Sequence, residues 1–398
     1  MIGQDRAGWP ELGTPGGGRA ELAQAPRTAL AGERRGRHVL FIAWRDLANP
    51  RAGGSEVLVD RLAAGMLARG DRVTLLCAGP AAEHGYRVIE NGGTYTQFLR
   101  APLAYWRRLR DADLVVEVCN GMPFLSPLWC KRPLICLVNH MHTDLWQLRF
   151  PAPVAAAGRF AESKLMPLAH RNNLFLTVSD STADALRKAG VGEDRIRQIC
   201  NGVVPPDPAT PRSPQPLFLA LGRLTDYKRV DLLLKLWGRV RPVVGGTLVI
   251  AGDGPERSRI EAMAGPGVIV AGRVSEQEKH RLLGAAWLLL HPALIEGWGI
   301  VVTEAAIRGT PAVGFDVPGL RDSVVNGQTG LLVGSEGEFA SAWASLALNH
   351  QARKAMGAAA RERAERLHWS LAVDGFARVA DDVLARAARG RERAGGAP

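Results

Sequence analysis

Short apolar segments alternate with amphipathic segments in two series along this chain, on either side of a proline-rich stretch at 205–216. Buried parallel strands are short and almost continuously apolar, and the helices that connect them carry apolar residues at three- and four-residue spacings. The alternation therefore predicts an α/β fold with two doubly wound parallel sheets. Such sheets bind ligands beyond the carboxyl ends of their strands, so two facing edges would form an interdomain cleft.

The first series begins with an apolar run at 38–43, which predicts a buried strand. A polar loop with Gly53 and Gly54 follows, and then a helix that ends at Gly70. Further strands are expected at 73–77, 114–118, 133–138 and 174–178, and a capped helix at 179–189.

The second series follows the proline-rich stretch. Strands are expected at 217–220, 247–251, 268–271, 288–291 and 311–314, and helices at 230–237, 255–263, 276–285 and from about Gly299. We therefore expect an N-terminal domain at 37–204, a linker at 205–216 and a C-terminal domain at 217–370. Residues 371–398 predict an Ala- and Arg-rich helix at about 371–389 and a fraying tail.

Residues 1–36 are rich in Gly, Pro, Ala and Arg and lack the apolar centre of a signal peptide. They predict a disordered leader or an incorrectly assigned start. No segment reaches the roughly 18 apolar residues of a membrane span. Together these features indicate a cytoplasmic protein.

The formal net charge is +11, which favours anionic partners such as phosphorylated small molecules, nucleic acid or an anionic membrane. Charge alone does not choose among them, and arginines on solvated helices would give the same value. A nucleic-acid binder needs a basic stripe with stacking aromatic residues or a known module, and the sequence shows neither. No nucleic-acid partner is therefore expected.

The five cysteines lie mostly in apolar runs and form no CxxC pair. This pattern indicates buried, reduced thiols and neither a disulfide framework nor a zinc site. The residues are Cys77, Cys119, Cys130, Cys136 and Cys200.

Two cations follow the strand expected at 217–220, beyond its carboxyl end. Gly222 and Arg223 leave the strand, and Lys228 comes five residues later. A planar guanidinium and an ammonium together suit a diphosphate, although a pair of loop cations is more often simply solvated.

A second candidate element runs from Glu296 to Glu304. Gly297 and Gly299 allow a sharp turn after the preceding strand, and the helix that follows directs free N–H groups into the cleft. A phosphate is expected at 299–301, ribose hydroxyls at Glu304, and a sugar near Glu296. The alternatives are a carboxylate that only stabilises the helix N-terminus, or the acid–base pair of a glycoside hydrolase. A phosphate-type turn between a loop carboxylate and a helix carboxylate favours ligand binding.

Four blocks of the second half resemble glycosyltransferase family 4: LGRLTDYKRVD, AGDGPER, EGWGIVVTEAAIRGTPAVGF and VPGLRDSVVNGQTGLLV. The first half resembles the same family in WRDLANPRAGGSEVLVDRLAAGMLARGDRVTLL, VSDSTADALRKAGV and NGV. The resemblance covers about residues 38–370. It implies the GT-B fold, with two Rossmann-like domains across a cleft. It also implies retaining transfer of a hexose from a GDP- or UDP-linked sugar, without a metal or other cofactor.

The resemblance also assigns roles to residues. Arg223 and Lys228 bind the donor diphosphate and stabilise the leaving group, Glu304 holds the ribose, and Glu296 contacts the transferred sugar. Gly54 lets the first loop approach donor and acceptor. The cation pair fits this chemistry, because fixed positive groups stabilise charge that develops on a diphosphate. The other donor-site residues implied are Gly222, Asp253, Gly254, Val274, Gly297, Trp298, Gly299, Ile300 and Val301.

The chain departs from the family after the strand at 133–138, where the family usually has a histidine and this sequence has Asn139. Either His140 or His142, or the amide of Asn139, is expected to fill that role on the acceptor side, where Gly53 also lies; His140 is the catalytic candidate. A histidine with no other sign of a role is more often a surface or hydrogen-bonded structural residue than a catalytic one. A position at the carboxyl end of a strand, facing the cleft, favours a catalytic role. A zinc site would lack further ligands.

The segment 98–110 mixes aromatic residues with arginines, as does a helix that lies on an anionic membrane and presents a lipid-linked acceptor. The other interpretation, which we favour from the sequence, is that Leu99, Leu103 and Trp106 pack on the protein's own sheet. The segment is still the best sequence indication of a peripheral position at the inner face of the membrane.

Other functions on this architecture are a nucleotide-sugar epimerase and a phosphorylase. An epimerase releases no nucleotide, and a phosphorylase needs a lysine that carries pyridoxal phosphate, which nothing in the sequence marks. The expected partners are a nucleotide-diphosphate sugar donor and a saccharide or lipid-linked acceptor.

Overall fold

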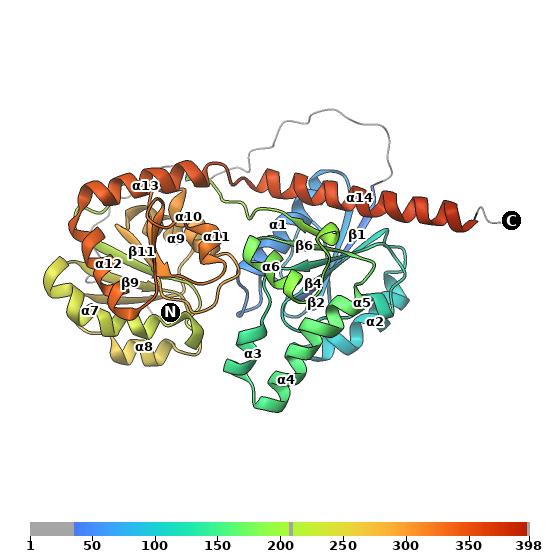
Figure 1. Cartoon of the computed structure of the whole chain (residues 1–398), viewed down its shortest axis with the longest axis horizontal. Helices are drawn as coiled ribbons and strands as arrows, with labels where there is room; N and C mark the ends of the chain where they lie inside the picture. Colours follow the sequence, from blue (N-terminus) through green and yellow to red (C-terminus); the bar gives the residue numbers. More distant parts are fainter. Residues whose placement is uncertain (1–35, 207–209, 396–398) are drawn as a thin grey trace.

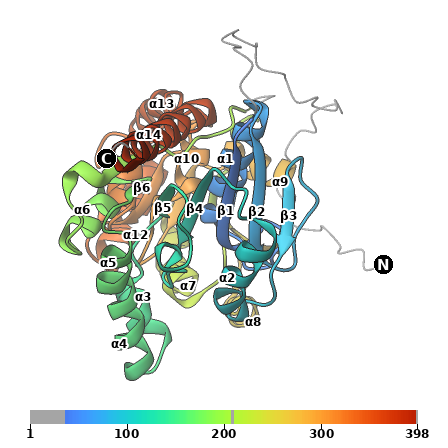
Figure 2. The same ribbon diagram turned by 90° about the vertical axis from the view of Figure 1, so that its right-hand side faces the viewer.

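The computed structural model describes residues 36–206 and 210–395, which form two lobes side by side (Figure 1). Each lobe is built on one parallel sheet. The strand order is β3-β2-β1-β4-β5-β6-β7 in the first sheet, where β3 to β6 form a row in Figure 2. The order in the second sheet is β10-β9-β8-β11-β12-β13. The predicted α/β fold with two parallel sheets is confirmed.

The strands of the first sheet are β1 (His38–Arg45), β2 (Arg72–Ala78), β3 (Arg87–Glu90), β4 (Leu114–Cys119), β5 (Leu134–Val138), β6 (Leu174–Thr177) and β7 (Ile196–Gln198). Those of the second sheet are β8 (Leu217–Leu221), β9 (Thr247–Ala251), β10 (Val268–Gly272), β11 (Leu288–His291), β12 (Ala312–Phe315) and β13 (Gly330–Val333).

The helices of the first domain are α1 (Gly54–Ala68), α2 (Thr96–Arg108), α3 (Thr143–Arg149), α4 (Ala152–Phe160), the π turn η2 (Ala161–Leu165), α5 (Met166–Ala169) and α6 (Asp180–Lys188). The second domain has α7 (Val230–Val244), α8 (Arg257–Met263), α9 (Glu276–Ala285), α10 (Ile300–Ala306), α11 (Leu320–Ser323), α12 (Glu336–Leu348) and α13 (His350–Ala364). Short 3₁₀ turns are η1 (Ser126–Leu128), η3 (Glu193–Arg195) and η4 (Asp226–Lys228), and α14 (Trp369–Gly395) is the last helix.

Strand β1 shows why the sequence forms these sheets. Successive side chains of a strand point to opposite faces. Val39 and Phe41 pack into the core that includes α1 and α14, whereas Leu40 and Ile42 pack into the core that includes α2. Because both faces are covered, the strand must be apolar throughout, which is the pattern that predicted it.

The helix α14 crosses from the second domain back onto the first (Figure 1). Its Phe376 is fully buried, and the ring lies 5.6 Å from that of Phe41 in β1. Close helix packing explains Gly65 in α1, where a Cβ would lie 2.3 Å from a methyl carbon of Val373. The sequence predicted this helix outside both domains, but α14 packs on the first domain. The helix also continues beyond residue 389.

The two segments that connect the domains run side by side. The amide of Val203 donates to the carbonyl of Leu367 at 2.8 Å, and Val203 forms a parallel bridge with His368. The end of the proline-rich stretch is attached to the second domain, since the Ser213 amide donates to the Ala285 carbonyl. The predicted leader, up to residue 35, and residues 207–209 of the linker lie outside the described residues.

The interpretation that Leu99, Leu103 and Trp106 pack on the sheet is wrong. Their exposed fractions are 85%, 46% and 54%, and α2 buries Ala101 and Tyr105 instead. Both sets of residues recur at helical spacing, so the sequence pattern alone does not choose between the two faces. No helix within residues 36–206 and 210–395 is long and apolar enough to cross a membrane.

Candidate functional site

The loops that follow β8 and β9 pack so closely that only glycine fits between them. A Cβ at Gly252 would lie 1.8 Å from the carbonyl oxygen of Gly222, and a Cβ at Gly254 would lie 2.2 Å from that of Leu224. Both glycines have positive φ, of 143° and 157°. This packing determines where Arg223 leaves the carboxyl edge of the second sheet.

The guanidinium of Arg223 reaches across to the first domain. Its Nη1 donates to the carbonyl of Arg51 at 3.0 Å, and its Nη2 donates to the hydroxyl of Tyr227 at 2.9 Å. A Cβ at Gly53 would lie 3.9 Å from its Nε. The predicted arginine and the predicted glycine loop therefore meet in the interdomain cleft.

Lys228, Glu296 and His291 form a compact charged cluster. The Lys228 ammonium and the Glu296 carboxylate form an ion pair, and His291 Nε2 lies 2.9 Å from the same carboxylate oxygen. Burial raises the pKa of Glu296, but Lys228 and His291 lower it by more, so that the carboxylate is anionic. Two segments 68 residues apart in the chain thus place opposite charges side by side.

The loop at 296–299 packs closely against Gly319 and leads into α10. Gly319 has a φ of 81°, and a Cβ there would lie 2.3 Å from the carbonyl oxygen of Glu296. Gly299, with a φ of 85°, precedes the first residue of α10, and Trp298 is 8% exposed. Its indole Nε1 is buried without a hydrogen-bond partner among the described residues.

On the other side of the cleft, the glycine loop before α1 faces α10. A Cβ at Gly54 would lie 3.0 Å from Cδ1 of Ile300 in the second domain. The amide of Gly53 donates to the Glu56 carboxylate at 2.8 Å, and that carboxylate pairs with Arg45 at 3.2 Å. This ion pair supports a loop whose lack of side chains allows the close approach.

The other residues predicted to bind the sugar donor contact neighbouring groups of the protein. The Glu304 carboxylate pairs with Lys279 at 2.8 Å. One oxygen of Asp253 accepts the Gly254 amide at 2.8 Å, while Val274 packs partly buried against the core below. A ligand at Glu304 would therefore meet a carboxylate whose charge Lys279 already balances.

Asn139 forms its hydrogen bonds within the first domain. Its side chain donates to Ser55 Oγ at 2.9 Å and to Asn120 Oδ1 at 3.3 Å, and its carbonyl accepts the Thr182 hydroxyl at 3.0 Å. It therefore joins the end of β5 to the first turn of α1, and has few groups left for a ligand.

His140 is the candidate whose side chain meets the second domain, next to the Asn139 backbone carbonyl oxygen, from which a Cβ at Gly297 would lie 3.0 Å. A Cβ at Gly297 would lie 3.3 Å from His140 Nδ1. The ring of His140 stacks on that of His142, with centroids 4.1 Å apart. Burial lowers the pKa of His140 to about 3 and that of His142 to about 4, so both imidazoles are neutral near pH 7.

Four residues of the site were not predicted from the sequence: Tyr227, Lys279, His291 and Gly319. His291 ends β11 at the carboxyl edge of its sheet, which is the signal that drew attention to His140. The other three are identified only by the contacts that the fold creates.

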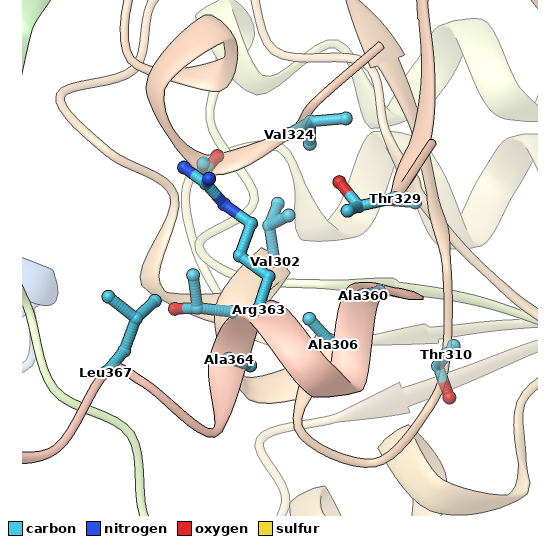
Figure 3. A pocket seen from close by; sticks show the side chains of 12 residues that line it. Val302, Ala306, Thr310, Val324, Thr329, Ala360, Arg363, Ala364 and Leu367 are labelled. Atoms are coloured by element: carbon cyan, nitrogen blue, oxygen red, sulfur yellow. The ribbon is translucent and has the colours of Figure 1, made fainter. Parts of the chain in front are cut away.

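A small cavity lies between α10 and α13, outside this cluster (Figure 3). Its volume is about 10 Å³, and Val302, Ala306 and Ala360 line it with Arg363. This volume is room for at most about one water molecule, so the cavity is not a ligand site.

Comparison with known families agrees with the fold and with the sequence resemblance. Residues 207–363 match the family described as "Glycosyl transferases group 1", and residues 52–205 match "Glycosyltransferase Family 4". The chain belongs to glycosyltransferase family 4. The two matches include most of both sheets and all of the cluster described above.

Curated relatives in this family match parts of the chain. A D-inositol 3-phosphate glycosyltransferase of Streptomyces bingchenggensis is 31% identical over 310 residues, which are 67% of this chain and 65% of that protein. One of Kribbella flavida is 32% identical over 174 residues, 38% of this chain and 40% of that protein. A glycogen synthase of Mycobacterium tuberculosis is 31% identical over 175 residues, 41% and 42% of the two chains. The chain thus spans less than two thirds of each of these relatives.

Several solved structures share the fold. WaaG, a glycosyltransferase involved in lipopolysaccharide biosynthesis, has a TM-score of 0.68 at 19% identity, covering 85% of this chain and 98% of WaaG. Sucrose-phosphate synthase of Thermosynechococcus elongatus has a TM-score of 0.74 at 20% identity, covering 88% and 100%. Anabaena HepE in complex with UDP and glucose has a TM-score of 0.68 at 17% identity, covering 87% and 100%. These similarities confirm the GT-B fold.

Proposed function

We propose that this family 4 protein is a retaining glycosyltransferase. It would move a hexose from a GDP- or UDP-linked donor to a hydroxyl of a lipid-linked or cell-envelope saccharide. The observation that carries the proposal is the cluster of Lys228 and anionic Glu296 beside Arg223, facing His140 across the cleft. The fold shared with HepE, whose structures contain UDP or UDP-glucose, supports a nucleotide-sugar donor.

The cluster suggests how the reaction proceeds. Arg223 and Lys228 bind the donor diphosphate and stabilise the negative charge that develops on it as the bond from C1 of the sugar to the diphosphate oxygen breaks. The acceptor hydroxyl forms the new bond to C1 on the same face and passes its proton to the departing diphosphate oxygen. Glu296 accepts a hydrogen bond from a sugar hydroxyl. Because the two side-chain cations supply the positive charge, the proposed mechanism uses no metal.

A thermal-shift screen tests the donor site first. Purified protein is heated with GDP, UDP, ADP and their common sugar conjugates, with and without a chelator. A ligand at a hundredfold excess over its Kd stabilises the folded state by about 2.7 kcal/mol. A chelator-insensitive shift with one nucleotide would identify the base, whereas no shift with any of them would contradict the proposed donor site.

Substitutions test the assigned residues. Lys228→Ala and Glu296→Ala are each expected to abolish transfer while the protein stays folded, because each removes a group that contacts the reacting sugar or its leaving group. Lys235→Ala is the matched control, since Lys235 is 59% exposed and pairs with Asp231 on its own helix α7. Near-normal turnover in either site variant would refute the assignment.

We also propose peripheral contact with an anionic membrane through α2. Its exposed Leu99, Leu103 and Trp106 share the helix with the exposed Arg107 and Arg108. An apolar row beside cations is the arrangement of interfacial helices. A groove of about 1040 Å³ borders the end of α2, and its lining extends the surface with Leu128, Lys131 and Arg132.

Vesicle co-sedimentation tests this contact. The protein is expected to sediment with vesicles that contain phosphatidylserine, and the pair Arg107→Glu and Arg108→Glu is expected to abolish sedimentation. The pair Arg239→Glu and Lys354→Glu changes the net charge equally on exposed helices of the second domain. Equal losses in both pairs would show a general charge effect, and no sedimentation of the unaltered protein would refute the contact.

A further inference from the structure

One buried carboxylate behind the cleft has no part in the mechanism above. Glu162 is 1% exposed and lies in the π turn η2 between α4 and α5. A single π turn within a helical segment is rare and is frequently found at functional sites. A buried carboxylate is energetically costly unless hydrogen-bond donors satisfy it.

The hydrogen-bond donors to Glu162 among the described residues come from the start of α3. The backbone amide of His142 donates to Oε1 at 2.7 Å, and Nε1 of Trp146 donates to Oε2 at 3.2 Å. Oε1 also lies 3.6 Å from His142 Nδ1, which has no hydrogen-bond partner among the described residues. The carboxylate thus fixes the turn at which the loop after β5 becomes α3.

In this turn, the ring of His142 has a close neighbour on each side. A Cβ at Gly121, whose φ is 84°, would lie 3.2 Å from this ring. On the other side the ring stacks on His140 with an interplanar angle of 29°, and His140 in turn abuts Gly297 of the second domain. A contiguous series of contacts therefore runs from Glu162 to the loop that carries Glu296.

The rings of His140 and His142 form a polar face that carries no charge near pH 7. Burial lowers the pKa of both imidazoles, and burial raises the pKa of Glu162 to about 7 even though the His142 amide and His140 act in the other direction. The charged groups that act on the two imidazoles are Arg45 of β1, Arg149 of α3, and Arg223, Lys228 and Glu296 of the second domain, and Glu162 itself helps to raise the pKa of Cys119 in β4.

We propose that Glu162 is a positioning residue for the transfer reaction: it holds the His142 turn so that His140 presents a neutral imidazole to the transferred sugar beside Gly297. The inference rests on the proposed function. Glu162 itself contacts neither substrate, and it acts through the two stacked histidines. It gives this chain a substitute for the histidine that the family usually has at the position of Asn139.

Histidine NMR tests the positioning without any substrate. The Cε1 resonances of His140 and His142, assigned by single His→Gln substitutions, are followed against pH. In the unaltered protein, both resonances are expected to keep the chemical shifts of neutral rings down to about pH 4. Both are also expected to show a small inflection near pH 7 from the titration of Glu162. Glu162→Gln is expected to remove the inflection, and Glu83→Gln, at an exposed position, is expected to keep it. Identical titrations in all three proteins would overturn the proposal.

Kinetics provide the second readout. With UDP-glucose or GDP-mannose as donor, Glu162→Gln is expected to lower kcat about 10- to 100-fold with donor KM changed by less than about threefold, because a displaced catalytic face costs rate rather than donor affinity. Trp146→Phe removes only one donor to Glu162 and is expected to have a smaller effect of the same kind. An unchanged kcat in Glu162→Gln would overturn the proposal. If the unaltered protein turned over neither donor, the proposed function would fail, and the NMR titration would still decide the role of Glu162.

Discussion

Glu162→Gln should change how the stability of the first domain depends on pH. The carboxyl group is almost completely buried and accepts two hydrogen bonds, from the His142 amide and the Trp146 indole. Glutamine has nearly the same shape and carries no charge. One of the two donors would face the glutamine NH₂ and lose its partner, which costs about 1 kcal/mol at every pH. The pH-dependent part of the difference therefore reports the buried charge.

The magnitude and sign follow from the pKa of Glu162, which burial raises from 4.5 to about 7. At about 1.36 kcal/mol for each pH unit, this rise corresponds to about 3 kcal/mol. Between pH 4.5 and about 7 the folded protein keeps the proton that the unfolded chain has lost. The free energy of unfolding therefore falls as pH rises through this window. The unaltered protein should be the more stable one near pH 4.5, and Glu162→Gln should be the more stable by about 2 kcal/mol above pH 7.

Urea unfolding of both proteins, followed by tryptophan fluorescence from about pH 4.5 to about pH 8, measures this crossover. The difference between the two proteins cancels the other groups that titrate in the window, including His140 and His142, provided that their pKa values are equal in both. Two stability curves that run parallel across the range would refute the reasoning, because they would show that Glu162 has the same pKa in the folded and unfolded states.

Gly319→Ala is expected to reduce transfer at least about tenfold, since its Cβ would lie 2.3 Å from a backbone oxygen of the 296–299 loop. Gly327→Ala has a similar φ of 78° and open space, and equal losses in both variants would show that strain alone is responsible. Phe376→Ala should destabilise the first domain by about 3–5 kcal/mol in urea unfolding, against less than about 0.5 kcal/mol for the exposed Leu371→Ala. Equal small effects would mean that α14 contributes little stability. Tyr227→Phe removes one acceptor of the site arginine, and is expected to lower the transfer rate about three- to tenfold; an unchanged rate would contradict a role for that hydrogen bond.

Much of the fold can be predicted because buried parallel strands leave a strong pattern. The runs that became β1, β8, β9 and β11 are apolar except at their ends, since helices cover both faces of each sheet. The strands β3, β7 and β13 were not predicted, because they are short edge strands and most of their residues are only partly buried or exposed. Short, partly exposed strands carry too few apolar residues to be recognised.

The candidate site was predictable where one loop holds the signal. Gly222, Arg223 and Lys228 lie within one loop after β8, and Glu296, Gly297 and Gly299 lie within another before α10; the structure places both loops at the carboxyl edge of one sheet. The partners that complete the site come from elsewhere. Lys279 reaches Glu304 from α9, and His291 reaches Glu296 from the end of β11. A single sequence shows such residues only as unrelated polar positions.

The sequence by itself determined the two alternating series, the glycine positions and the cations at the strand ends, because each depends on local chain geometry and on which residues are buried. Tertiary structure alone decided which face of α2 is exposed, that α14 returns to the first domain, and that the side chain of His140, rather than that of Asn139, meets the second domain. It also brought Glu162 behind the histidine pair. These outcomes depend on which surfaces of distant segments fit together, and periodicity within one segment contains no information about its partner.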